Sequence, residues 1–109
     1  MAQKPASTVS IVLTTLGADA DAAAIARTLI DERLAACVNI LSPMTSVYRW
    51  QGKVEQDREQ QLVIKTASDR VGDLQARLRQ LHPYELPEFL VLDATGSDAY
   101  VTWVGESAR

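Results

Sequence analysis

Residues 36–66, which read ACVNILSPMTSVYRW, QG and KVEQDREQQLVIKT, decide the fold. The pair Gln51–Gly52 is typical of a tight hairpin turn, because glycine tolerates a positive φ. We therefore expect two long antiparallel strands, Ala36–Trp50 and Lys53–Thr66, on either side of it. Pro43 lacks a backbone N–H, so it predicts an edge position, a bulge or a break in the first strand.

The two ends of this ribbon differ in character. Residues 55–60 are all polar, whereas Leu62–Ile64 are apolar and suit both faces of a sheet. One end of the ribbon should therefore belong to the core, and the other should project into water or onto a partner.

Strands and helices alternate on both sides of the ribbon. Thr8–Leu16 is rich in β-branched residues and predicts a central strand. Apolar residues at helical spacing predict a helix that Asp19 caps and that ends near Ala35, and a second helix that ends at Pro83. A short strand, Glu88–Ala94, and a short C-terminal helix that Ser97 caps complete the chain.

The order β-α-β-β-α-β-α predicts an α+β protein with a ferredoxin-like βαββαβ sandwich, a long central hairpin and a short C-terminal helix. We expect one domain over residues 8–109 and a flexible N-terminal tail over residues 1–7. Both main helices cover one face of the sheet, so the apolar residues on the other face predict an oligomer.

Composition excludes several classes of protein. The 109 residues carry 11 Lys and Arg against 14 Asp and Glu, a net charge of −3, which argues against nucleic acid as the main partner. No segment is long and apolar enough for a membrane span, so we expect no membrane partner. The single cysteine, Cys37, permits no intrachain disulfide and fits the cytoplasm.

Three residues could form a mixed metal site. Cys37, His82 and a carboxylate such as Glu85 offer the thiolate, imidazole and oxygen donors that divalent metals bind. Two alternatives stay open: Cys37 as a small buried apolar residue, and His82 as a helix C-cap. No nucleophile, base and orienting group line up in the motifs, so we do not expect an enzyme.

A series of motifs, taken in order, resembles the CutA family, the divalent-cation tolerance proteins. They are ERLAACVN at 32–39, TSVYRWQGKVE at 45–55, IKT at 64–66, HPYELPE at 82–88, and Tyr100 with Trp103. The resemblance covers residues 9–109. It implies a ferredoxin-like homotrimer, similar in assembly to the PII signalling proteins, whose hairpins wrap onto neighbouring subunits.

The resemblance also implies a function. Bacterial members are linked to tolerance of copper and other divalent cations, and Cys37, His82, Glu85 and Asp57 stand at positions that match a copper site. Some members carry a second cysteine where this chain has Thr14, which weakens a dithiolate site.

The motifs further imply a cleft between subunits that contains Trp50, Lys65, Tyr84 and Glu88. The alternative function is that of a PII-like signalling trimer, which binds a small anionic ligand in this cleft and acts through a protein partner.

Overall fold

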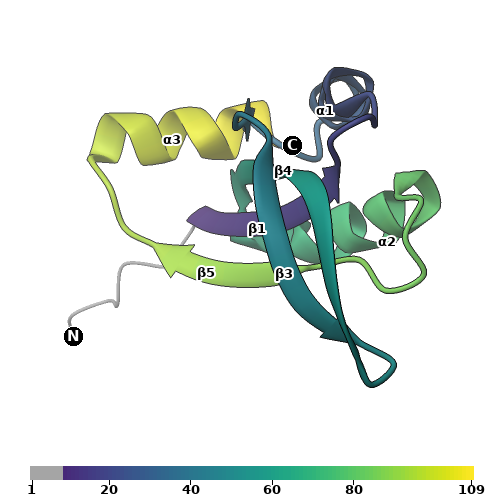
Figure 1. Cartoon of the computed structure of the whole chain (residues 1–109). Helices are drawn as coiled ribbons and strands as arrows, with labels where there is room; N and C mark the ends of the chain where they lie inside the picture. The colour runs from purple at the N-terminus through teal and green to yellow at the C-terminus, as the bar shows by residue number, and fades with distance from the viewer. Residues whose placement is uncertain (1–8) are drawn as a thin grey trace.

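The computed structural model describes residues 9–109, so the tail predicted for residues 1–7 lies outside the described residues. Figure 1 shows a sheet with helices packed against it and a hairpin that extends beyond it. The elements follow in this order: β1 (Val9–Gly17), α1 (Ala22–Asp31), β2 (Cys37–Ile40), β3 (Met44–Trp50), β4 (Lys53–Ala67), the short 3-10 helix η1 (Ser68–Arg70), α2 (Val71–Leu81), β5 (Leu90–Ala94) and α3 (Asp98–Ser107).

The sheet confirms the predicted ferredoxin-like α+β architecture. Its strand order is β2-β4-β1-β5, all neighbours are antiparallel, and β3 also pairs with β4. The long strand β4 joins the sheet to the hairpin: its C-terminal half pairs with β1 and β2, and its N-terminal half pairs with β3.

The predicted strand Ala36–Trp50 is two strands in the structure. The backbone leaves the ladder between Ile40 and Met44, around Pro43, because proline has no N–H to donate. The long hairpin is therefore β3–β4. Its turn is the predicted one, with φ of 50° at Gln51 and 81° at Gly52, the two left-handed residues that a two-residue hairpin turn requires.

The first helix differs from its prediction at both ends. Asp21, rather than Asp19, is the N-cap, and its Oδ1 accepts a hydrogen bond from the Ala24 N–H at 3.0 Å. The helix ends at Asp31 instead of Ala35, and Arg33 follows with a φ of 59°, which turns the chain toward β2. The apolar residues at 34 and 35 mimic one more helical turn, although they are core residues of the connecting loop.

The core lies between one face of the sheet and helices α1 and α2. Alternation along the strands sends Val12, Leu16, Leu62 and Ile64 to this face, where they pack with Leu29 of α1 and with Leu74 and Leu78 of α2. Within the described chain, no helix has the length and apolar character to cross a lipid bilayer.

The opposite face of the sheet, called the helix-free face because neither α1 nor α2 packs on it, is only partly covered. By register, Ile11 pairs with Leu92 and Leu13 with Leu90, and both β5 leucines are more than half exposed. Helix α3 contacts β1 and β4, and at one end of this face Val9 is buried. The rest of the helix-free face, including the base of the β3–β4 hairpin, faces outward.

Candidate functional site

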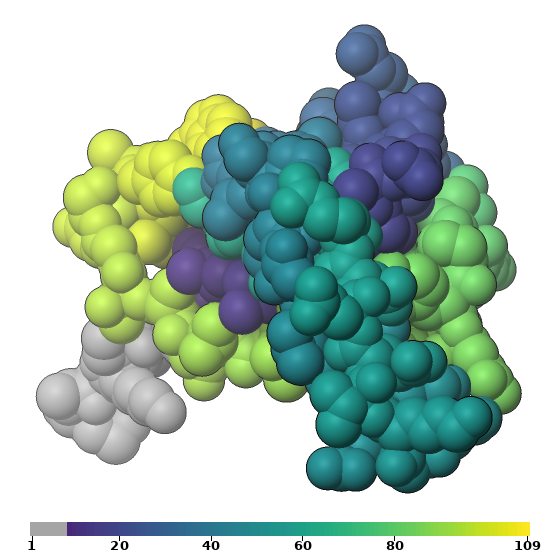
Figure 2. Space-filling view, viewed as in Figure 1, coloured from purple at the N-terminus to yellow at the C-terminus, as the bar shows by residue number. Residues whose placement is uncertain are grey.

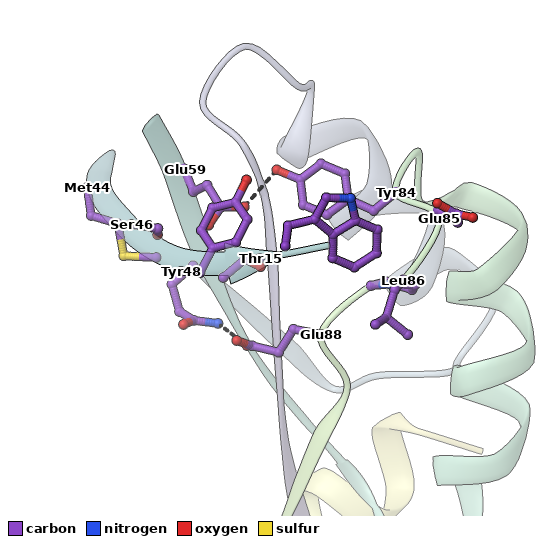
Figure 3. Close-up of a pocket in the computed structure, with 12 residues that line it drawn as sticks. Thr15, Met44, Ser46, Tyr48, Glu59, Tyr84, Glu85, Leu86 and Glu88 are labelled. Carbon is purple, nitrogen blue, oxygen red and sulfur yellow. Dashed lines mark hydrogen bonds between the residues drawn. The ribbon is translucent and has the colours of Figure 1, made fainter. Parts of the chain in front are cut away.

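A groove of about 700 Å³ lies at the base of the hairpin on the helix-free face. Its floor is formed by side chains of the central strands, namely Thr15 of β1 and Glu59 and Gln61 of β4. One wall is β3 and the other is the link from α2 to β5, residues 84–88. Figure 3 shows side chains from all three segments converging on this space, and Figure 2 shows the hairpin standing out from the body of the molecule.

Strand register explains why β3 supplies the first wall. Met44 pairs with Glu59, so alternate residues of β3 share the face of Glu59. Those residues are Met44, Ser46, Tyr48 and Trp50, and all four line the groove.

His82 anchors the second wall. It follows the last residue of α2, and its side chain is buried at 7% exposure. Its Nδ1 accepts a hydrogen bond from the Tyr84 N–H at 3.1 Å, which leaves Nε2 as the protonated nitrogen that donates to the Thr15 carbonyl at 2.6 Å. The ring therefore ties the link to β1, close to the C-terminal end of that strand.

Three hydrogen bonds then position the polar side chains. The Tyr84 hydroxyl donates to Glu59 Oε2 at 2.7 Å, and Gln61 Nε2 donates to Glu88 Oε2 at 3.0 Å. The Tyr48 hydroxyl donates to Asp57 Oδ2. The first two bonds connect the link to β4, and the third lies within the hairpin.

Each hydroxyl-to-carboxylate bond raises the pKa of a tyrosine. The hydrogen bond to Asp57 is the main cause that raises the pKa of Tyr48 to about 12. Burial, followed by the hydrogen bond to Glu59, raises the pKa of Tyr84 further above its ordinary value. Both phenols therefore stay neutral donors at physiological pH.

Tyr48 and Tyr84 are expected to remain largely protonated at pH 11. A phenol with a pKa of 12 is about 10% ionised there, against about 90% for an ordinary one. Because the folded state favours the neutral phenols, their contribution to stability is present below pH 10 and is lost as the pH rises through 12. A tyrosinate absorbance titration of the wild type and of a Tyr48→Phe, Tyr84→Phe double variant measures this. The double variant should lack the late phase, Tyr100→Phe should retain it, and complete ionisation of the wild type by pH 11 would contradict the prediction.

The groove is acidic. Glu59, Glu85 and Glu88 line it, and the lining contains no lysine or arginine. Glu59 is only 7% exposed, and in the described part of the chain neither Glu59 nor Glu88 forms an ion pair. A buried carboxylate without a basic partner attracts cations and repels anions.

The predicted metal ligands do not converge within one chain. Cys37 lies on β2, where its Sγ contacts Asn39 Oδ1 at 3.8 Å, and both ring nitrogens of His82 are engaged within the fold. Glu85 lines the groove, and Asp57 is bound to Tyr48. Among residues 9–109 no three His, Cys, Asp or Glu side chains form a group that could hold a metal ion.

The residues expected at a cleft are distributed unevenly. Trp50, Tyr84 and Glu88 line the groove together, whereas Lys65 pairs with Cys37 farther along β4 and does not line it. Sequence reasoning missed Glu59, which lies in a run of polar residues. Strand alternation puts Glu59 on the same face as Asp57 and Gln61. Only the pairing of Glu59 with Met44 shows that this face lines the groove.

The sequence is similar to that of a known protein family along nearly its whole length. The sequence model of the CutA1 divalent ion tolerance protein family matches residues 10–107. The chain belongs to the CutA1 family. The divalent-cation tolerance protein CutA of Thermus thermophilus is 44% identical over 89% of this chain and 95% of its own length, and that of Pectobacterium atrosepticum is 41% identical over the full length of both.

Solved CutA structures share the fold. The divalent cation tolerance protein of Thermus thermophilus superposes with a TM-score of 0.88 at 42% identity, covering 93% of this chain and 99% of that one. A CutA from Nostoc, described as a PII-like protein, superposes with a TM-score of 0.85 at 35% identity, covering 92% and 97%. The resemblance to CutA and to PII-like folds is therefore confirmed for this CutA1 chain.

Proposed function

We propose that this CutA1 protein acts in the tolerance of divalent metal ions, as a cytoplasmic homotrimer that binds the ion at the acidic groove. The observation that best supports this role is the lining of the groove, which has three carboxylates and no basic side chain. The names of the relatives, which refer to divalent-cation tolerance, support the same role. The role is one of binding rather than catalysis.

The trimer supplies what one chain lacks. A stable site for a divalent metal needs several converging donors, and the carboxylates of the groove supply only hard oxygen atoms. In this proposal a neighbouring copy, packed on the helix-free face, contributes the remaining donors, so that Cys37 acts only if it reaches the groove of another subunit. Copper is the leading ion, because Cu²⁺ binds a given set of nitrogen, oxygen and sulfur donors more tightly than the other divalent first-row ions do.

The alternative, a PII-like trimer that binds a small anion, finds less support in this groove. An anion would meet three carboxylates, and Lys65 does not line the groove. The likeness to a PII-like CutA supports a shared fold but does not supply the missing positive charge.

Calorimetric titration with Cu²⁺ at pH 7 and pH 5 tests the metal proposal. We expect binding at pH 7 and clearly weaker binding at pH 5, because protons compete for the donor groups. Glu85→Gln should weaken binding by about tenfold, because the loss of a metal ligand, or of a group that supports a ligand, typically lowers metal affinity by about 10–100-fold. Asp69→Asn, an exposed charge change outside the groove, is the matched control.

Two comparisons make the titration decisive. Cys37→Ser weakens binding if the thiolate of one subunit serves the groove of another, and leaves it unchanged if oxygen donors suffice. An absence of binding to wild type would reject the proposed metal site, and equal affinity at both pH values would exclude the Cys37 thiolate as a donor.

A further inference from the structure

We propose that the same groove also binds a small organic cation, a primary ammonium compound with a flat apolar body. The ammonium group would lie against Glu59 and Glu88, and the apolar body against the aromatic rings of the hairpin and the link. This inference goes beyond metal binding and does not depend on it.

The size of the groove leaves room for a molecule larger than a bare ion. A volume of about 700 Å³ lies within the range of sites for small organic ligands. A metal ion fills only a small part of such a space and needs donors that converge on a point. Within the described single chain the carboxylates do not form such a group, whereas an ammonium needs only one or two of them.

The free oxygen atoms in the groove are acceptors. Glu59 and Glu88 each accept a hydrogen bond at Oε2, from Tyr84 and Gln61, and within residues 9–109 no hydrogen bond reaches either Oε1. An ammonium group offers three N–H donors and a positive charge, which match unpartnered carboxylate oxygens. The ammonium would also give the buried Glu59 a positively charged partner, which it does not have within residues 9–109.

Aromatic rings complete the site. In the single chain, Tyr48, Trp50 and Tyr84 line the groove and each is between 36% and 40% exposed, so that a ligand, like a neighbouring copy of the chain, can reach part of each ring. Ring faces attract cations, and flat apolar groups pack on them. In Figure 3 the Tyr84 hydroxyl points to Glu59, while Leu86 and Glu88 lie on the other side of the space, below Tyr84 in the view.

The combination is more specific than its parts. Carboxylates alone would accept any cation, and aromatic rings alone would accept any flat apolar molecule. Together, without a basic side chain in the lining, they select molecules that are both cationic and apolar, and they reject carboxylates and phosphates.

Calorimetric titration of the full chain with benzylammonium chloride in EDTA tests this inference, with benzyl alcohol as the neutral analogue. We expect wild type to bind the cation at least about tenfold more tightly than the alcohol, because a hydrogen bond to a charged group contributes that much. Glu59→Gln, which can still accept from Tyr84, should weaken binding by about tenfold, and Glu88→Gln is a second variant. Trp50→Leu should weaken it by about threefold. Glu106→Gln, an exposed change on α3, should leave it unchanged.

The outcomes separate this inference from metal binding. Equal affinity for benzylammonium and benzyl alcohol, or an unchanged affinity in both Glu59→Gln and Glu88→Gln, overturns it, as does an absence of binding to wild type. Because EDTA removes divalent metals, these results do not depend on the copper titration. Circular dichroism of each variant shows whether a loss of binding reflects a loss of fold.

Discussion

Replacing His82 with alanine is expected to lower the free energy of unfolding by about 3 kcal/mol. The buried ring satisfies the carbonyl of Thr15 through Nε2 and the N–H of Tyr84 through Nδ1. Its removal leaves both backbone groups without these partners, and each unsatisfied buried group costs about 1–3 kcal/mol. The link should also lose its fixed position against β1, which would loosen the groove.

Urea unfolding at one fixed protein concentration measures this effect, since association would otherwise change the apparent stability. Gln75→Ala, an exposed change on the outer face of α2, is the control and should stay within about 0.5 kcal/mol of wild type. Faster hydrogen exchange at the Tyr84 amide in His82→Ala would locate the effect in the link. A His82→Ala variant as stable as Gln75→Ala would mean that the two hydrogen bonds contribute nothing net.

Replacing Leu92 with glutamate is expected to dissociate the proposed homotrimer. Leu92 is 51% exposed in the single chain and pairs with Ile11 on the helix-free face. If three copies cover this face, the substitution buries a carboxylate in an apolar interface, which costs several kcal/mol per subunit. At micromolar concentration, light scattering coupled to gel filtration should then report three chains for wild type and one for the variant.

Gln75→Glu introduces the same charge on α2 and should leave the assembly intact. A trimer that persists in Leu92→Glu would show that the subunits meet on another surface. A monomeric wild type would remove the proposed assembly and, with it, the donors that a neighbouring copy is proposed to supply.

Much of the fold follows from local chemistry. The Gln51–Gly52 turn and the Ser97 cap of α3 are as predicted, because each depends on a few neighbouring residues. The strand order follows from alternating strands and helices with right-handed crossovers. The errors fall at element ends: Asp19 and Asp21 are both acceptable caps, and only the packing of α1 decides between them.

The site was harder to predict, because it combines segments far apart in the chain. The HPYELPE motif indicated His82, Tyr84 and Glu88. It does not show that both ring nitrogens of His82 form hydrogen bonds with backbone groups. Nor does it show that Glu59, within a polar run, becomes a buried residue opposite Met44. Both facts depend on register between distant strands, which residue types alone do not determine.

The three-way pairing of β4 has a consequence for the order of folding. Its contacts with β3 are local and need only the two-residue turn, so this hairpin can form within microseconds. Its contacts with β1 join residues far apart in the sequence, such as Val9 with Ala67, and require closure of a long loop. We therefore expect the groove to be completed late, when the already formed hairpin docks onto β1 and the link closes over it.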